Sequence, residues 1–271
     1  MTALFVVSDV HSFYTPLKKA LDEKGFDPNN KDHWLISCGD AFDRGDESEE
    51  VLKFLMSLER KVLIKGNHDL LFKDCCLRGY PLSHDYHNGT SATIYDLGGG
   101  NKGANFSECC DIAWTRTEAY RNSLVNYFET KNYIFVHSWI PTIVESDGTM
   151  KPWYQAGKIY HYRDDWRNAT EGEWEEAMWG NPFKMWKRGL NQTGKTIVFG
   201  HWHCSTGHSM ESIVKSWGND EECLISEFED DAIWEPFIKD NIIGIDRCTA
   251  YTGEVNVLVL EDEFLDSKSN N

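Results

Sequence analysis

The sequence predicts an α/β fold built on a largely parallel sheet, because strand-like and helix-like segments alternate from Ala3 onward. A second observation supports this fold class. Several of the strand-like segments end in a short motif rich in Asp, Asn and His, and open α/β sheets bind ligands beyond the carboxyl ends of their strands. At 271 residues the chain is long enough for one large core, so we expect a single domain over residues 1–271.

In the first part of the chain, short apolar runs are followed by longer amphipathic segments. Residues 3–7, 33–38 and 61–65 are the predicted strands. Residues 13–24 and 46–60 carry apolar side chains at helical spacing, so we predict helices there. The second helix begins with acidic residues, which favour the positive end of a helix dipole. This order of elements requires right-handed crossovers between parallel strands.

The later part of the chain continues the pattern less regularly. We predict helices over residues 68–77 and 118–128, and strands over residues 133–136, 241–245 and 254–260.

The segment of residues 139–194 differs in kind, because tryptophans and tyrosines crowd into it. The tryptophans are Trp139, Trp153, Trp166, Trp174, Trp179 and Trp186. One interpretation is that this segment is an insertion that caps the mouth of the active site. The other is that its aromatic side chains anchor a long, weakly apolar insertion onto the body of the protein. The two interpretations are compatible, and the sequence leaves both open.

Five polar motifs each follow an apolar strand-like segment. They are Asp9-x-His11, Gly39-Asp40-x-x-Asp43-Arg44-Gly45, Gly66-Asn67-His68-Asp69, a single His137, and Gly200-His201-Trp202-His203. Each motif alone is a weak signal, but their order and shared context favour one site. Oxygen and imidazole ligands without thiolates suit Mn, Fe(II), Zn or Mg. Five strand ends offer enough ligands for two metal ions. A pair of adjacent metal ions is a common means of attacking a phosphate ester with water.

On these motifs, the chain resembles the calcineurin-like metallophosphoesterases, and within them the bacterial and phage branch of the serine/threonine phosphoprotein phosphatases. The match is densest over residues 5–69 and returns at His137, at residues 198–201 and at residues 244–246. The resemblance implies a metallophosphoesterase fold, in which two mixed β-sheets pack face to face with flanking helices.

The resemblance also implies a dinuclear metal site, and two adjacent cations need an anionic ligand between them. Asp40 is the candidate for this bridge. The first metal would take Asp9, His11 and Asp40, and the second would take Asp40, Asn67, His137 and His201. Mn is the preferred ion, with Fe, Zn or Mg as alternatives. His203 departs from the phosphoprotein phosphatase branch. The wider family has this Gly-His-x-His pattern, and its second His completes the shell of the first metal.

Three residues are the candidates for catalysis. His68 lies next to Asn67 and is not needed as a ligand, so we expect it to donate a proton to the leaving alkoxide. Asp43 would orient His68, although a role as the cap of the following helix is the alternative. Arg44 would bind phosphate oxygens bidentately. Asn67 is also a candidate substrate contact.

The resemblance implies a second phosphate-binding Arg in the phosphoprotein phosphatase branch, and we expect it to be replaced here. That Arg stands in a Trp-x-Arg stretch, and the best match here is Trp179-Gly180-Asn181. Asn181 can hydrogen-bond a phosphate but brings no charge.

Composition narrows the partners and the compartment. The net charge of −17 argues against nucleic-acid binding, which needs basic surface. No apolar run approaches the length of a membrane span. The eight cysteines include the vicinal pairs Cys75-Cys76 and Cys109-Cys110, which suit a disulfide framework poorly, so we expect a reduced, cytoplasmic protein.

The sequence therefore predicts a metal-dependent phosphoric ester hydrolase. The leading expectation is a serine/threonine protein phosphatase acting on phosphorylated protein. The alternative is a hydrolase of a dinucleoside polyphosphate or of a small phosphodiester. A binding protein with a degenerate site is the alternative from another class, although no proposed ligand is missing. The sequence leaves the oligomeric state open.

Overall fold

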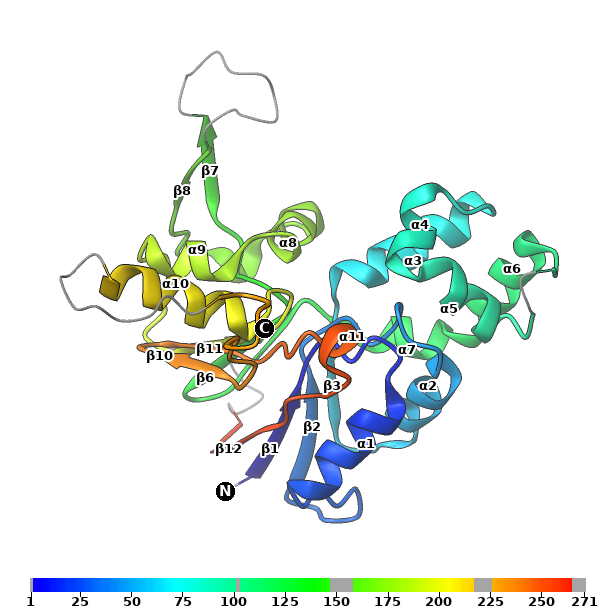
Figure 1. Cartoon of the computed structure of the whole chain (residues 1–271), viewed down its shortest axis with the longest axis horizontal. Coiled ribbons are helices and arrows are strands. Elements are labelled where there is room, and N and C mark those ends of the chain that lie inside the picture. Colours follow the sequence, from blue (N-terminus) through cyan, green and yellow to red (C-terminus); the bar gives the residue numbers. More distant parts are fainter. Residues whose placement is uncertain (1, 101–102, 147–157, 217–225, 265–271) are drawn as a thin grey trace.

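A computed structural model describes residues 2–100, 103–146, 158–216 and 226–264, and two five-stranded sheets form its centre (Figure 1). The first sheet has the strand order β12-β1-β2-β3-β4 and the second has the order β10-β11-β9-β6-β5. Each sheet is mixed. Strands β1 to β4 run parallel and β12 is antiparallel to β1, whereas β6, β9 and β11 are parallel with antiparallel neighbours at both edges.

The strands of the first sheet are β1 (Thr2–Val7), β2 (His33–Ser37), β3 (Lys61–Ile64), β4 (Leu124–Val125) and β12 (Leu258–Asp262). Those of the second are β5 (Tyr127–Glu129), β6 (Tyr133–Val136), β9 (Thr196–Phe199), β10 (Phe237–Lys239) and β11 (Ile242–Gly244).

The two sheets pack face to face, because alternate side chains of the central strands point into one shared core. Leu4 and Ile36 enter this core from the first sheet, and Phe135 and Val198 enter it from the second. The other face of each strand is also apolar and lies against helices. Strands buried on both faces are typical of sheets covered by helices. The predicted metallophosphoesterase-type sandwich of two mixed sheets is confirmed.

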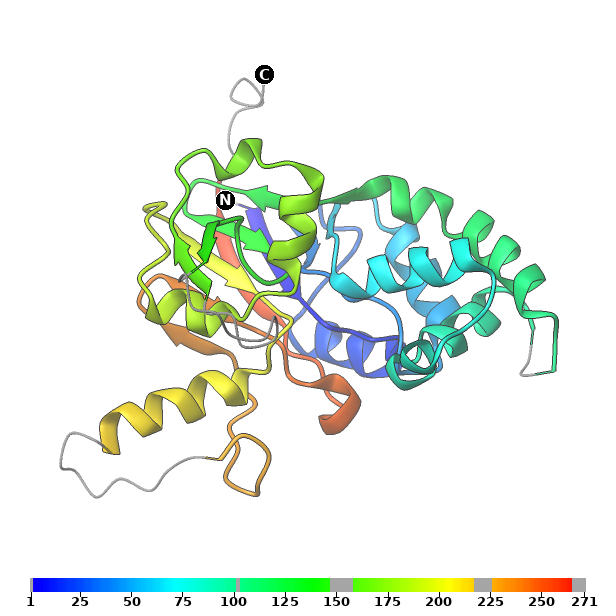
Figure 2. The same cartoon turned by 90° about the horizontal axis from the view of Figure 1, so that it is seen from above.

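Helices cover the outer face of the first sheet (Figures 1 and 2). They are α1 (Tyr14–Glu23), α2 (Ser48–Ser57), α3 (Asn67–Arg78), α5 (Thr90–Leu97), α6 (Phe106–Arg116) and α7 (Glu118–Ser123). The short helix α4 (Ser83–Asn88) packs against α5. Both α1 and α2 occur where helical spacing predicts them.

In the aromatic segment, the described residues 139–146 and 158–194 place apolar side chains against the second sheet. The segment contains the hairpin β7 (Ile143–Ser146) and β8 (Lys158–His161), the short helix η1 (Trp166–Asn168), α8 (Glu171–Met178) and α9 (Pro182–Lys187). Trp139, Trp166 and Trp174 are buried against that sheet. These side chains anchor the segment, as the second interpretation holds. Trp153 lies outside the described residues.

Two predicted boundaries are wrong. The helix expected over residues 118–128 ends at Ser123, because the chain then pairs with β3 and β6 as β4 and β5. The strand expected over residues 254–260 covers Leu258–Asp262 instead, and α11 (Thr249–Thr252) precedes it. Pairing across a sheet depends on distant segments, so local pattern places these ends poorly.

The last helix, α10 (Cys204–Ser216), follows β9. No described helix is long and apolar enough to cross a bilayer. The seven cysteines within the described ranges are all free thiols.

Candidate metal centre

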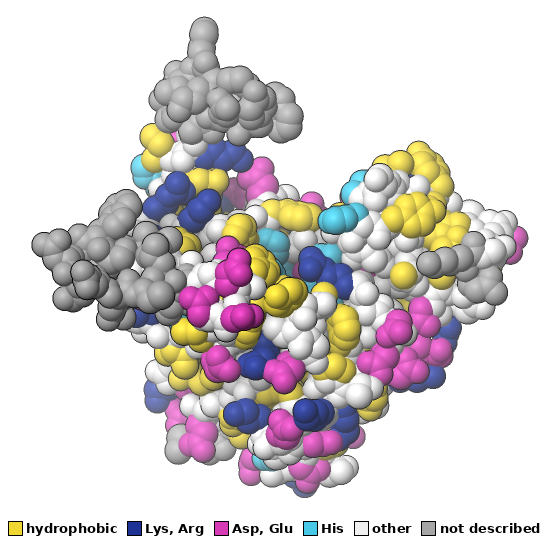
Figure 3. Space-filling view, viewed as in Figure 1, with side chains coloured by type: hydrophobic (Ala, Val, Ile, Leu, Met, Phe, Trp, Pro, Cys, Tyr) yellow, Lys and Arg dark blue, Asp and Glu magenta, His cyan; other side chains and the backbone are white. Residues whose placement is uncertain are grey.

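The carboxyl ends of β1, β2, β3, β6 and β9 meet at one place between the two sheets. The loops that leave these strands carry the predicted ligands Asp9, His11, Asp40, Asn67, His137 and His201. All but His201 are buried, and His201 is partly buried. In Figure 3, histidine side chains show at the bottom of a hollow between two lobes of the surface. The structure thus brings together residues that lie far apart in the chain.

The loops around this site have unusual backbone conformations. Nine described residues other than glycine have positive φ, and eight of them belong to these strand-end loops: Asp9, His11, Ser12, Asp40, Asp43, Arg44, His201 and Cys248. Such conformations cost on the order of 1–3 kcal/mol each and concentrate at functional sites. Contacts with the surrounding structure must therefore stabilise these backbone conformations.

Two glycines let the loops approach one another closely. A Cβ atom at Gly66 would lie 2.0 Å from Oδ1 of Asp40, and one at Gly200 would lie 2.1 Å from Oδ2 of Asp9. No side chain fits at either position without moving a predicted ligand. The glycines of the motifs are therefore explained by contact with the site.

Asp40 lies at the centre of the predicted ligands. Its Oδ2 is 3.4 Å from Nε2 of His137, 3.9 Å from Nε2 of His68 and 4.0 Å from Nε2 of His11. Two groups of side chains could each hold a metal ion, one of His11, Asp40 and His68, and one of Asp40, His137 and His201. Asp40 belongs to both, which is the position that a bridging ligand requires.

Two histidines are held so that Nε2 faces the site. The Nδ1 atom of His11 lies 2.9 Å from the carbonyl oxygen of Phe42, and Nδ1 of His137 lies 2.8 Å from that of Cys38. A carbonyl only accepts hydrogen bonds, so Nδ1 carries a proton in both rings and Nε2 is the nitrogen that faces the site. Metal-binding histidines are commonly oriented in this way. Nε2 of His137 also lies 2.7 Å from Oδ1 of Asn67, and both atoms point into the same space.

The electrostatics of the site also fit cations. Burial raises the pKa of Asp9, whereas the imidazoles of His137, His68 and His11 outweigh burial and hold the pKa of Asp40 below its usual range. Burial, followed by His137, lowers the pKa of His201 to about 3. Imidazole nitrogens beside buried carboxylates form a donor set for divalent ions, because buried carboxylates need a compensating charge.

His68 and Asp43 form a buried pair beside the ligands. Nδ1 of His68 lies 2.7 Å from Oδ2 of Asp43, which also accepts a hydrogen bond of 2.6 Å from Thr90. Burial opposes protonation, but the charge of Asp40 and the hydrogen bond to Asp43 raise the pKa of His68 to about 9. With bound cations, the effect of Asp40 would be weaker. The pair can hold a proton at the edge of the cleft.

The cleft over these residues has a volume of about 160 Å³. It is lined by Asp9, His11, Asp40, Asn67, His68, His201 and His203, and also by Arg44, Leu71, Asn88, Trp179, Asp246, Cys248, Thr249 and Ala250. Arg44 is exposed and forms no ion pair with another described residue. Its charge is available to an anionic group that enters the cleft.

His203 and Asn181 differ from the other predicted site residues in their contacts. His203 lines the cleft, and its Nδ1 is buried without a hydrogen-bond partner among the described residues, but it belongs to neither group of potential ligands. Its ring contacts Phe228 and Trp234. Asn181 does not line the cleft. It caps α9, because its Oδ1 accepts a hydrogen bond of 3.0 Å from the backbone N–H of Lys184. The phosphate contact expected of Asn181 stays a prediction.

Sequence reasoning did not assign a role to Asp246 or Thr90. Asp246 is buried in the wall of the cleft, where burial and the charge of Asp9 raise its pKa well above the usual range. It follows β11, and the same strand-end pattern that identified Asp40 could have singled it out. In the sequence, Thr90 is a hydroxyl residue directly after Asn88-Gly89, and nothing in that pattern indicates its contact with Asp43.

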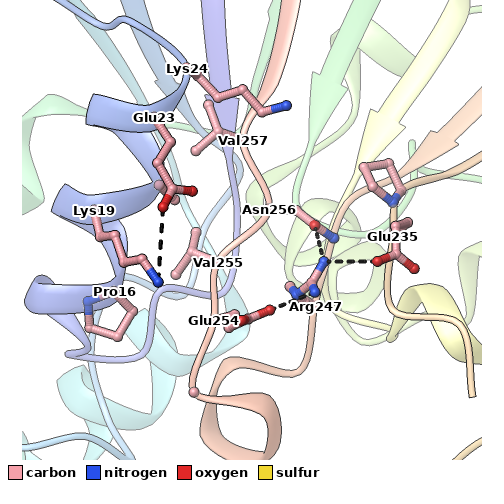
Figure 4. A pocket seen from close by; sticks show the side chains of 13 residues that line it. Pro16, Lys19, Glu23, Lys24, Glu235, Arg247, Glu254, Val255, Asn256 and Val257 are labelled. Atoms are coloured by element: carbon pink, nitrogen blue, oxygen red, sulfur yellow. Dashed lines mark hydrogen bonds and ion pairs between the residues drawn. The ribbon is translucent and has the colours of Figure 1, made fainter.

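A neighbouring cavity of about 300 Å³ lies between α1 and the segment around Arg247 (Figure 4). Its charged side chains are paired except for Lys24, which has no ion pair with another described residue. Arg247 contacts Glu254 and Glu235 and donates a hydrogen bond of 3.0 Å to Asn256, and Lys19 pairs with Glu23. This cavity therefore offers less to an anion than the cleft does.

The chain belongs to the calcineurin-like phosphoesterase family, whose profile matches residues 3–205. This is a family of metal-dependent phosphoester hydrolases with a dinuclear site. A symmetrical bis(5'-nucleosyl)-tetraphosphatase of Pseudomonas fluorescens (strain SBW25) is 32% identical over 140 residues, which are 51% of this chain and 44% of that protein. The chain thus matches less than half of that relative's length.

Two solved structures align with most of this chain at low sequence identity. One, provisionally described as a diadenosine tetraphosphatase, has a TM-score of 0.49 and 15% identity, over 96% of this chain and 89% of its own. The other is a serine/threonine phosphatase of Saccharomyces cerevisiae with similarity to human PP5. Its TM-score is 0.47 at 14% identity, over 98% of this chain and 81% of its own.

Proposed function

We propose that this protein hydrolyses phosphoric esters and anhydrides with the help of two divalent cations, and that its substrate is a dinucleoside polyphosphate. The observation that carries the hydrolytic part is the arrangement around Asp40. Its carboxylate faces three imidazoles across one buried space, and the His68–Asp43 pair stands beside it.

The residues that would hold the ions follow from this arrangement. Asp9, His11 and Asp40 would hold the first, with His203 completing the set, and Asp40, Asn67, His137 and His201 would hold the second. When bound, such a pair of ions supplies a nucleophilic hydroxide at neutral pH and offsets the charge of the phosphate. Mn is the first ion to test, because the donor set contains oxygen and imidazole without thiolate.

The other side chains of the cleft have separate tasks. Arg44 binds phosphate oxygens through its guanidinium, which suits a tetrahedral anion better than an ammonium does. His68 donates the proton from Nε2 to the leaving oxygen. Asp43 holds the other nitrogen of that ring and, with Thr90, fixes its orientation. The proton donated by His68 should accelerate the reaction least when the leaving group is a weak base that scarcely needs protonation.

The choice of substrate reverses the leading expectation from the sequence. Support for a dinucleoside polyphosphate comes from the similarity to the tetraphosphatase of P. fluorescens, which is 32% identical over 140 residues. The position of Asn181 also supports it, since no arginine stands where the phosphoprotein phosphatase branch has its second one. A phosphoprotein substrate stays a prediction that the experiment below addresses.

The test is a comparison of substrates after metal removal and reconstitution. The chelated protein is supplied with Mn, and initial rates are measured on p-nitrophenyl phosphate, diadenosine tetraphosphate and a phosphothreonine peptide. We expect activity to require the metal and kcat/KM to be highest for the tetraphosphate. No turnover of any of the three with Mn, Fe(II), Zn or Mg would contradict the hydrolytic proposal. A higher kcat/KM for the peptide would contradict only the choice of substrate.

A further inference from the structure

A further cavity, separate from the one in Figure 4, shares Trp179 with the cleft. This cavity, the aromatic pocket, has a volume of about 280 Å³ and lies between β7, β8, α8 and α9. Its apolar lining includes Trp139, Ile140, Val144, Tyr160 and Met185. Its size is close to the lower end of the range for small-molecule sites, and it is lined in the way such sites are, with aromatic and aliphatic side chains and a few polar groups.

Trp179 differs from the other tryptophans that surround it in sequence. Its side chain is 51% exposed, whereas Trp139, Trp166 and Trp174 are at most 3% exposed. Its one ring contact within the described residues is with His201, whose plane is at 89° to its own at a distance of 6.3 Å. No described aromatic ring therefore stacks on the indole, and a flat group that did so would remove apolar surface from water.

The polar groups of the aromatic pocket suit a heteroaromatic ring. The buried Nε1 of Trp139 has no hydrogen-bond partner among the described residues, and Trp139 itself is 2% exposed. A buried indole N–H normally donates a hydrogen bond, so a missing acceptor needs an explanation. Glu176 lines the same pocket, is exposed and is unpaired within the described ranges, so its carboxylate is available to accept a hydrogen bond from the edge of a ring.

We propose that the aromatic pocket binds the base of a nucleoside polyphosphate whose phosphate chain lies in the cleft, with the base stacked on Trp179. This inference rests on the function proposed above and assigns its specificity to particular residues. Stacking tolerates any base, because every base has a π-face, so Trp179 selects nucleotides as a class. A phosphoserine or phosphothreonine peptide carries no such ring at a fixed distance from its phosphate.

Binding provides a test that does not depend on turnover. The affinities of ADP and of inorganic pyrophosphate are measured by calorimetry on the parent protein and on Trp179→Ala. Loss of one base–aromatic stack weakens binding by about 5- to 100-fold. We expect a loss of this size for ADP and a clearly smaller one for pyrophosphate, with Trp179→Phe recovering most of the ADP affinity. Equal losses for both ligands, or an unchanged affinity for ADP, would overturn the proposal.

Two further variants make the test independent of the folding of Trp179→Ala. Val144→Trp places a large ring in the aromatic pocket from an exposed strand position. This variant should therefore also weaken the binding of ADP more than the binding of pyrophosphate. Tyr86→Ala is the matched control, since Tyr86 is 62% exposed and lines none of the cavities described here. It should change neither affinity. If Val144→Trp binds ADP as the parent does, the aromatic pocket is not the base site.

Turnover separates this inference from the proposed function. With Mn present, Trp179→Ala should raise KM for diadenosine tetraphosphate more than for inorganic tripolyphosphate, and kcat should change less than KM. A parent protein that binds ADP through Trp179 but hydrolyses neither compound would contradict the proposed function and support the base site. A parent that hydrolyses both compounds with kinetics unaffected by Trp179→Ala would contradict the base site alone.

Discussion

Nδ1 of His68 lies 2.7 Å from Oδ2 of Asp43, and the Thr90 hydroxyl holds the same carboxylate oxygen at 2.6 Å. This arrangement fixes which nitrogen of His68 is bound and leaves Nε2 facing Asp40 and the cleft. Position and orientation are the properties required of a side chain that donates a proton to a leaving group.

His68→Asn should therefore lower turnover by about 10²- to 10⁴-fold on an alkyl phosphate, the usual contribution of a positioned acid. The loss should be smaller on p-nitrophenyl phosphate, whose leaving group scarcely needs a proton. Bound metal, measured by elemental analysis, should stay close to the parent value. Equal losses on the alkyl and aryl esters would assign His68 another role.

Asp43→Asn should lower turnover less than His68→Asn does, because the acid remains but loses its charged partner. Residues that act as a unit show strongly non-additive effects. The double variant should then be no slower than His68→Asn alone. The check is a double-mutant cycle on kcat with the alkyl phosphate, and multiplicative losses would show that the two residues act separately.

His203→Ala should weaken one of the two ions selectively. The other ligands of the first ion, Asp9, His11 and Asp40, remain in place, and a water molecule can take the vacant position. We expect about one tightly held ion per chain after dialysis and activity that excess Mn restores. A variant with the metal stoichiometry and affinity of the parent would place His203 outside the ligand set.

Gly200→Ala should disrupt the site, because the added methyl group would lie 1.8 Å from Oγ of Ser8 and 2.1 Å from Oδ2 of Asp9. We expect weaker metal binding and a lower melting temperature. Gly172→Ala is the matched control, since nothing lies within 4 Å of its Cβ position and it is in α8, where Ala is favoured over Gly by roughly 0.5–1 kcal/mol. Similar behaviour of the two variants would refute the close approach at Gly200.

The sequence predicts this site well for a physical reason. Asp9, Asp40 and Asn67 follow parallel strands, and the ends of parallel strands converge whatever covers the sheet. The predictions that depend on tertiary packing fared differently. Most of residues 124–129, expected in a helix, form strands because distant strands pair with them. Trp139 and Trp174 are core side chains of the second sheet, which is one of the two interpretations that the sequence left open.

The positions of Trp179 and Asp246 in the cleft also depend on packing. Trp179 reaches the cleft from the end of α8, and Asp246 reaches it from the end of β11 on the second sheet. The strand-end pattern could have singled out Asp246, whereas the contact of Trp179 follows from no local pattern, because it requires the two sheets to be packed against one another.

The central claim is that Asp40 joins two ions in one site, and metal stoichiometry tests it most directly. The parent protein and Asp40→Asn are reconstituted with Mn, dialysed and analysed for metal per chain, and circular dichroism verifies that the variant is folded. We predict about two ions in the parent, and loss of most of the metal together with the activity in Asp40→Asn, because a neutral amide cannot offset the repulsion between two cations. A folded Asp40→Asn variant that keeps two tightly bound ions and its activity would contradict the account.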